Sequence, residues 1–421
     1  MTSSSNSDDD ASYADGLSSL QAGIILSNSI MGSGLLAMGF VFRCAGFWSF
    51  LIISAIAAFS AYSGNNIVDM LYYDETDKKK RLHGYVDIGE QLSTSFGRKL
   101  SNLINLVVNF CLSILVLLLS GGLLHSIAPT ASPNTWTLLC SLAILPTLFV
   151  QRMKTLYYVS LISVVLTTLL SLEVSYYGLN FNKQYFKNIR GSFHRKIDSL
   201  SIGFGITIMT FTSTPYVALV EKVMLRPKEF TRVFNRANIL VTILKLCTGA
   251  MTYMAFGKST TTMMPMQLPE GWIRIAAVVS TSIAAVSYVT LPIYAIFDMM
   301  EHSFPKILLV GNQTEPSAGL LLCCRTVLLV TVIVLAIITP HFSLITAFIA
   351  AFLGNILVFI LPAVFVLLLK FSEIGRLEIV INILVVVVFS FWGLVGTIYS
   401  AIIIRKVLHG SELNNASILE L

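Results

Sequence analysis

Charge is what this sequence has least of. Only 12% of its 421 residues are Asp, Glu, Lys or Arg, whereas an average soluble domain has about 25%. A chain of this length with so little charge cannot cover a globular surface with polar groups, which excludes an ordinary soluble enzyme. Because 55% of the residues are hydrophobic, the chain is also too apolar to remain disordered in water. These numbers leave a membrane protein with several spans, built from helices or from a closed barrel.

Several chemical signatures are missing as well. The six cysteines do not have the spacing of a metal site or a disulfide framework, and we interpret them as small core residues. The sequence contains no serine nucleophile elbow, paired metal-binding histidines or phosphate loop, so neither catalysis nor a cofactor is expected. The longest basic run, residues 78–81, is too short to favour nucleic-acid binding. The net charge of +6 is expected to reflect basic cytoplasmic loops.

Long uncharged stretches predict eleven transmembrane helices, because each crossing needs about 20 apolar residues. The predicted spans lie within residues 16–42, 44–68, 100–151 (two spans), 156–177, 199–220, 238–256, 275–297, 326–369 (two spans) and 379–404. Strands of a barrel alternate apolar and polar residues, and the stretches 112–119 and 384–389 do not. The sequence therefore predicts an all-α polytopic membrane protein.

Three parts of the chain are expected. Residues 1–18 are rich in Ser and Asp and are predicted to be a disordered head. Residues 19–404 form the transmembrane domain, and residues 405–421 form a short tail. Lys and Arg are more numerous in the loops on the side of the N-terminus, which predicts that the N-terminus is cytoplasmic. With an odd number of spans, the tail is expected outside the cell or in a lumen.

Two of the predicted spans are poorly suited to continuous helix. The first contains residues 27–34, SNSIMGSG, with two glycines and three serines, which disfavour a helix interior. The sixth contains residues 210–215, TFTSTP, where Pro215 cannot donate to the carbonyl of Phe211. Interrupted spans in corresponding positions of two halves are typical of transporters with inverted repeats. This pattern predicts a five-plus-five repeat with one extra helix. The alternative is two packing faces of small residues.

Such breaks have a chemistry that suits amino acids. A half-helix that ends within the membrane offers free N–H groups to a carboxylate, and its counterpart offers carbonyls to an ammonium group or a cation. No cluster of charged residues lies at the breaks, which favours neutral α-amino acids as substrates. The predicted substrate-binding residues are Ser29, Ile30, Met31, Gly32, Ser33 and Gly34 in the first span, and Thr210, Phe211, Thr212 and Ser213 in the sixth.

The eighth span carries a possible cation site. Pro292 cannot bond the carbonyl of Tyr288, which leaves an oxygen beside the hydroxyls of Ser287 and Thr290. Oxygen ligands alone suit a hard cation. The alternative is a proline-kinked packing helix whose hydroxyls bond to their own backbone.

Two ionisable residues fall within other spans. Glu173, near the outer end of the fifth span, is a candidate proton-coupling carboxylate, and a solvated boundary residue is the alternative. Lys245, in the seventh span, is expected to extend its side chain to the cytoplasmic face rather than to serve the substrate.

Residues 26–36, LSNSIMGSGLL, resemble the first-helix signature of the amino acid/auxin permease family. The resemblance is closest to the sodium-coupled neutral amino acid transporter branch, whose pattern reads approximately L-S-N-A-I-M-G-S-G-I-L-G. It implies a fold like that of the bacterial leucine transporter, with alternating access around spans one and six. In that branch the Asn of this motif and a Thr-x-Pro in span eight form a sodium site. Asn28 and Thr290 match these positions, and Ser287 and Tyr288 complete the predicted site.

The sequence thus predicts a secondary active transporter of neutral α-amino acids, driven by sodium symport. A proton-coupled vacuolar or lysosomal transporter that uses Glu173 and a transporter-like amino acid sensor are the alternatives. The loop near residues 178–199 has no cysteine, unlike that of many plasma-membrane members of the resembled branch. Both the plasma membrane and a vacuolar or endolysosomal membrane therefore stay open. The sequence does not specify an oligomeric state.

Overall fold

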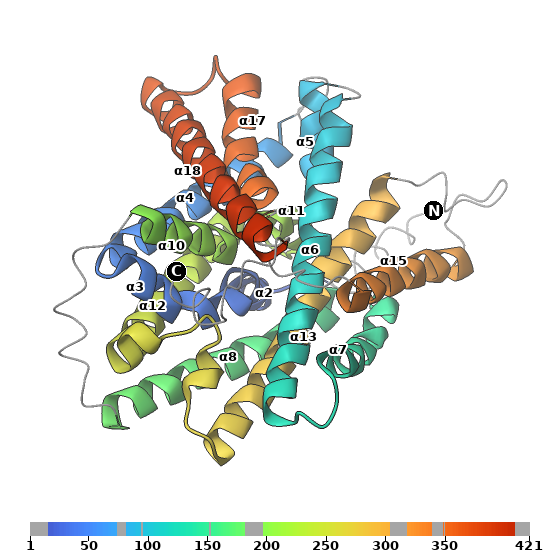
Figure 1. Cartoon of the computed structure of the whole chain (residues 1–421). Coiled ribbons are helices and arrows are strands. Elements are labelled where there is room, and N and C mark those ends of the chain that lie inside the picture. Colours follow the sequence, from blue (N-terminus) through green and yellow to red (C-terminus); the bar gives the residue numbers. More distant parts are fainter. Residues whose placement is uncertain are drawn as a thin grey trace.

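The computed structural model describes residues 16–73, 81–93, 96–150, 153–181, 197–303, 318–338, 348 and 350–408. The described residues are helical almost throughout, and their only β-type pairing is a single bridge between Leu17 and Met224. Ten helical segments in this part of the chain are long and apolar enough to cross a membrane. The predicted all-α fold with many spans is therefore confirmed, and Figure 1 shows its arrangement.

The helices follow the predicted spans closely. The single-helix spans are α4 (Trp48–Leu71), α6 (Phe96–Ile127), α8 (Met153–Phe181), α12 (Phe230–Phe256), α13 (Trp272–Ser303), α15 (Ala318–Ile338) and α18 (Arg376–Leu408). The composite spans are α2 (Ser19–Met31) with η1 (Ser33–Ala37) and α3 (Met38–Ala45), then α10 (Ile197–Thr210) with α11 (Thr214–Lys222), and finally η6 (Ala350–Gly354) with η7 (Ile356–Ile360) and α17 (Leu361–Leu369). A short helix, α5 (Tyr85–Leu92), precedes α6.

The predicted fourth span is divided rather than continuous. Its helix α7 (Pro133–Leu142) ends early, and a 3-10 turn, η2 (Leu145–Phe149), follows it. Pro146 has no N–H to donate to the carbonyl of Leu142, so α7 cannot continue through this point. This segment is therefore not among the ten long apolar spans.

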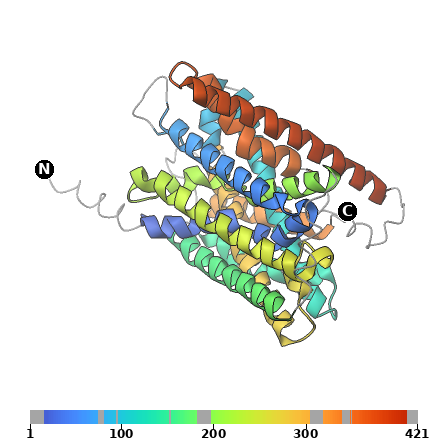
Figure 2. The ribbon, with the colours of Figure 1, turned by 90° about the vertical axis from the view of Figure 1, so that its left-hand side faces the viewer.

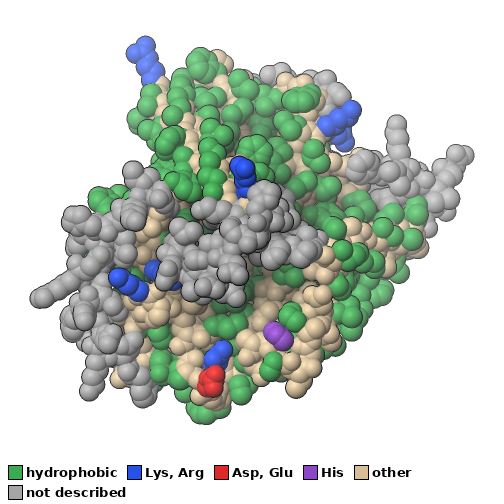
Figure 3. Space-filling view, in the orientation of Figure 1, with side chains coloured by type: hydrophobic (Ala, Val, Ile, Leu, Met, Phe, Trp, Pro, Cys, Tyr) green, Lys and Arg blue, Asp and Glu red, His purple; other side chains and the backbone are tan. Residues whose placement is uncertain are grey.

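The outside of the bundle is apolar. Leu377 and Trp272 expose 75% and 77% of their surface, and hydrophobic side chains cover most of the described surface in Figure 3, with few charged ones between them. Figure 2 shows α18 along the outer edge of the bundle. Because an apolar surface of this extent is stable only against lipid, the chain is a multi-pass membrane protein.

The two composite spans α2–α3 and α10–α11 lie in the centre of the bundle. Their membrane-spanning windows are the most buried of the ten, at 67% and 72%. Helix α12 packs against α2, α3 and α8, and α13 packs against α6 and α8. The segments that the sequence predicts to be broken thus pack against continuous helices, α2 against α8 and α12, and α10 and α11 against α4.

The start of α2 is fixed beside the end of α11. Leu17 is fully buried, its amide donates to the Val223 carbonyl at 2.8 Å, and its own carbonyl accepts from Leu225 at 2.9 Å. Residues 1–15 of the predicted head and residues 409–421 of the predicted tail lie outside the described residues. The disorder predicted for the head and the position predicted for the tail stay predictions.

Candidate substrate site

The first break is centred on Gly32. Helix α2 ends at Met31, and Gly32 has a φ of +45°, which favours glycine over every residue with a side chain. A Cβ at Gly32 would also lie 3.2 Å from Cζ of the Tyr288 ring. The 3-10 turn η1 then carries the chain to α3. The interruption that the sequence predicts in the first span is therefore present, and it begins where glycine is required.

The second break separates α10 from α11. Helix α10 ends at Thr210, and α11 begins at Thr214 with Pro215 in its first turn, where a missing N–H costs nothing. The carbonyl of Phe211 accepts from the Ser213 amide at 2.9 Å and from the Ser60 hydroxyl at 3.3 Å. The Ser213 hydroxyl is buried and has no hydrogen-bond partner among the described residues. This predicted interruption is also present.

The two breaks touch each other at Gly34. A Cβ placed on Gly34 would lie 2.4 Å from Cβ of Thr210 and 2.9 Å from its Cα. No real side chain tolerates such distances, so the missing side chain of Gly34 is what allows the two broken spans to approach. The contact brings together residues more than 170 positions apart in the sequence.

A cavity of about 130 Å³ lies at this junction. Its polar lining consists of Ser29, Gly32, Ser33, Gly34, Thr210 and Tyr288, and its apolar lining of Ala37, Leu112, Leu115, Ile206 and Met209. An engineered cavity of roughly 150 Å³ holds benzene, so a small amino acid fits here. No charged side chain is part of this lining.

Half of the predicted substrate residues line this cavity, namely Ser29, Gly32, Ser33, Gly34 and Thr210. The other five, Ile30, Met31, Phe211, Thr212 and Ser213, are buried directly beside it along the chain. The apolar wall from α6 and α10 was not predicted. Leucine, isoleucine and methionine are common throughout a membrane span, so the sequence does not show which of them line a cavity and which pack against other helices.

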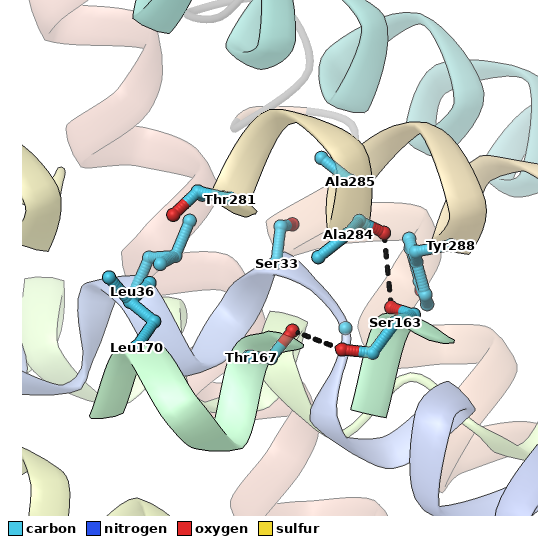
Figure 4. A pocket seen from close by; sticks show the side chains of 10 residues that line it. Ser33, Leu36, Ser163, Thr167, Leu170, Thr281, Ala284, Ala285 and Tyr288 are labelled. Atoms are coloured by element: carbon cyan, nitrogen blue, oxygen red, sulfur yellow. Dashed lines mark hydrogen bonds between the residues drawn. The ribbon is translucent and has the colours of Figure 1, made fainter. Parts of the chain in front are cut away.

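A second, smaller cavity of about 10 Å³ lies against α8 and shares Gly32, Ser33 and Tyr288 with the first. It has room for roughly one water molecule. Figure 4 shows Ser163 and Thr167 of α8 on one side and Ala284 and Tyr288 of α13 on the other. The Ser163 hydroxyl donates to the Ala284 carbonyl at 3.0 Å, and the Thr167 hydroxyl donates to the Ser163 carbonyl at 2.7 Å. Helix α8 is thereby bonded to α13 beside the first break.

The residues of the predicted sodium site have other partners in this structure. The side-chain amide of Asn28 donates to the Ser160 hydroxyl at 3.2 Å, and the Thr290 hydroxyl donates to the Ser287 carbonyl at 2.7 Å. Helix α13 is continuous through Pro292. No hydrogen bond joins Asn28 to Thr290 within the described residues. The sodium site stays a prediction.

Lys245 lies elsewhere than expected. The sequence predicts a side chain that extends to the cytoplasmic face, and this prediction is wrong because the residue is fully buried. Its Nζ donates to the carbonyls of Ile30 at 2.8 Å and Thr210 at 2.5 Å. It also lies 3.7 Å from the centre of the Phe211 ring. The Lys245 side chain thus joins the two breaks directly. The sequence gives only the position of Lys245 along its span, and that position does not show which remote carbonyls the side chain meets.

Glu173, the other ionisable candidate, lies apart from this junction. Its side chain on α8 is partly exposed, and it does not line the 130 Å³ cavity. Within the described residues it forms no hydrogen bond or ion pair. Its proposed role in proton coupling stays a prediction.

Charged side chains close the bundle on the face where α2 begins. Glu221, at the end of α11, is almost fully buried and pairs with Arg81 at 2.6 Å; it also accepts a hydrogen bond from Tyr72. On α13, Asp298 pairs with His83 at 2.8 Å. These contacts tie α11 and α13 to the segment before α5.

Two interrupted central helices that meet at a cavity define a class, the secondary transporters with the leucine-transporter fold. Solved structures of that class share this fold. A sodium-coupled sialic acid symporter aligns with a TM-score of 0.59 and 13% identity, covering 92% of this chain and 89% of the symporter. MhsT, solved in complex with L-phenylalanine, aligns with a TM-score of 0.52 and 12% identity, covering 86% of this chain and 98% of MhsT.

The chain belongs to the transmembrane amino acid transporter protein family, whose model matches residues 15–403. It is 24% identical to the vesicular inhibitory amino acid transporter of Xenopus laevis, over 90% of this chain and 76% of that one. It is 23% identical to the amino acid transporter AVT1B of Arabidopsis thaliana, over 90% of this chain and 70% of that one. The family confirms the resemblance seen in residues 26–36, and its members are transporters rather than enzymes.

Proposed function

We propose that this protein moves small neutral amino acids across an intracellular membrane by cation-coupled alternating access. The observation that carries the proposal is the cavity between the two breaks, which is lined by hydroxyls, glycine backbone and apolar side chains without a charged group. A substrate with a charged side chain would have no partner there, and burying an unpaired charge is costly.

The backbone at the breaks supplies what a zwitterion needs. The turn η1 begins at Ser33, and the first N–H groups of a helical turn have no partner within it, so they are available to a carboxylate. The Ser33 and Tyr288 hydroxyls, which also belong to the cavity, are available to the ammonium group. This arrangement supports an amino acid as the substrate.

The relatives support the substrate class and the membrane. Two of them are named a vesicular inhibitory amino acid transporter and, in Caenorhabditis elegans, a vesicular GABA transporter. The first name states an inhibitory amino acid and the second states GABA, and both names state a vesicular location. We therefore favour an intracellular membrane over the plasma membrane for this chain.

The coupling ion has two candidates. Sodium symport would use the oxygens of Asn28, Ser287, Tyr288 and Thr290. Proton coupling is favoured by a specific observation: the carbonyls at the two breaks, where a cation would bind, already accept hydrogen bonds from Lys245.

The test is transport by purified protein in liposomes, with radiolabelled glycine, alanine, GABA, glutamate and lysine supplied separately. We expect uptake of glycine, alanine or GABA, and none of glutamate or lysine. Sodium and pH gradients imposed one at a time identify the coupling ion. Uptake restricted to the charged amino acids would contradict the proposal.

A further inference from the structure

The Lys245 side chain has partners at both breaks. An ammonium group has three N–H donors. Two of them meet the carbonyls of Ile30 and Thr210, and the face of the Phe211 ring is available to the third. The side chain is fully buried in the middle of α12. The three partners therefore match the three donors of the charged form of Lys245.

The two carbonyls belong to the last turns of α2 and α10. The C-terminal end of a helix carries the negative end of its dipole, so two such ends converge on one point. In transporters with broken helices, carbonyls at these ends coordinate the coupling sodium ion or proton. Lys245 places a covalently attached cation where a free ion would otherwise bind.

In the part of the chain that the structure describes, no carboxylate pairs with Lys245. Helix α2 has no ionisable side chain. The charged residues on α12 itself, on the described elements that pack against it and on α11 are Arg43, Asp69, Lys154, Glu173, Glu221, Lys222, Lys228, Glu229, Arg232, Arg236 and Lys258. Within the described residues none of them forms an ion pair with Lys245, and no tyrosine, histidine or cysteine bonds to it. The ammonium group depends on the two carbonyls and the ring alone.

We propose that Lys245 is the coupling cation of this transporter and carries one proton through the site in each cycle. The proposal rests on the proposed function, because it requires α2 and α10 to move relative to each other during alternating access. When they separate, the ammonium group loses at least one carbonyl. A buried ammonium group with fewer partners is less stable, so one N–H bond breaks, the electron pair stays on Nζ, and the proton passes to a water molecule on the side to which the cavity has opened. The neutral amine takes a proton from a hydronium ion of the opposite side before α2 and α10 close on it again.

The experiment compares two assays in sodium-free liposomes, using radiolabelled glycine, alanine and GABA separately. The first assay measures exchange of labelled for unlabelled amino acid without any gradient, and the second measures accumulation driven by a pH gradient of either direction. The wild-type protein is expected to perform both. A symmetric exchange requires binding and alternating access but no net proton movement, so the two assays separate the proposed function from the coupling.

The decisive variant is Lys245→Arg. A guanidinium group keeps the positive charge but does not release its proton. We expect accumulation to fall at least tenfold more than exchange does. The matched control is Lys228→Arg, the same substitution at an exposed lysine just before α12, which is expected to keep both activities.

A second variant covers the case in which arginine is too large for the site. Phe211→Leu removes the ring face from the ammonium group and leaves both carbonyls in place. Because the charged form loses a partner, we expect the midpoint of the pH profile of accumulation to move to lower pH. A purely structural role for Lys245 would leave that midpoint where it is in wild type.

The possible results distinguish the assignment of Lys245 from the proposed function. Undiminished accumulation by Lys245→Arg, or an unmoved pH midpoint in Phe211→Leu, overturns the assignment of Lys245. Wild-type protein that exchanges an amino acid but accumulates none under a pH gradient also overturns this assignment alone. Wild-type protein that exchanges none of the three amino acids overturns the proposed function, and the assignment with it.

Discussion

The imidazole rings of His83 and His302 are stacked, with their centroids 3.9 Å apart and their planes 9° from parallel. His83 Nε2 lies 2.8 Å from Asp298 Oδ2, and His302 Nε2 lies 2.9 Å from Asp87 Oδ1. The pair of Asp87 with His302 connects α5 to α13, and the pair of His83 with Asp298 connects the segment just before α5 to α13. Helix α13 also carries Tyr288, which lines the cavity, so we expect these contacts to separate when the cavity opens toward this face.

Asp87→Asn tests the contribution of these pairs to stability. Burial raises the pKa of Asp87, but hydrogen bonds from the His302 ring and the His83 amide outweigh it, and the pKa lies below its ordinary value of 3.8. A carboxyl whose pKa is lowered by folding stabilises the protein above the ordinary pKa, and this stabilisation is lost as the pH falls through the lowered pKa. We expect the variant to lose about 1.5–3 kcal/mol at pH 7, seen as a lower melting temperature in detergent.

The matched control is Glu90→Gln on the same helix. Glu90 pairs with Arg98 at 2.8 Å, but both side chains are more than one-third exposed, and such surface pairs contribute about 0–1 kcal/mol. Equal losses of stability in the two variants, or a loss in Asp87→Asn that persists unchanged below pH 3.8, would contradict the role of the paired carboxylate.

Gly34→Ala tests the approach of the two breaks. The new Cβ would lie 2.4 Å from Cβ of Thr210 and 2.9 Å from its backbone Cα. The broken spans must therefore move apart. We expect uptake to fall at least tenfold while the protein still inserts and purifies as a single species. The control is Gly205→Ala on α10, where a Cβ meets nothing within 4 Å. Normal uptake by Gly34→Ala would mean that the substrate does not bind at this junction.

The sequence predicted the breaks well because their causes are local. Glycine at residue 32 and proline at residue 215 act on their own backbone, so the interruptions at Gly32 and before Thr214 could be foreseen. The position of Lys245 could not, because it depends on how α12 packs against α2 and on where two remote carbonyls meet. The division between α7 and η2 could also have been predicted, since Pro146 causes it locally. It was missed because a span predicted by counting uncharged residues takes no account of proline.

Thr290→Ala tests the sodium hypothesis. If Asn28 and Thr290 share a sodium ion, the loss of one oxygen ligand should raise the sodium concentration for half-maximal uptake about tenfold, which corresponds to about 1.4 kcal/mol. The control is Ser282→Ala in the same helix. The Ser282 hydroxyl donates to the Val278 carbonyl at 2.9 Å, much as the Thr290 hydroxyl donates to the Ser287 carbonyl at 2.7 Å. Uptake by wild-type protein that does not respond to sodium would rule out this hypothesis.

Glu173→Gln separates the two routes for a proton. If Glu173 carried the proton, its amide replacement would flatten the pH profile of uptake, because glutamine neither gains nor loses a proton. The structure favours the opposite result. Glu173 does not line the 130 Å³ cavity, whereas Lys245 bonds to both breaks. We therefore expect Glu173→Gln to keep the wild-type pH profile in liposomes, within a few tenths of a pH unit. A flattened pH profile in this variant, with normal exchange, would show that Glu173 rather than Lys245 carries the coupling proton.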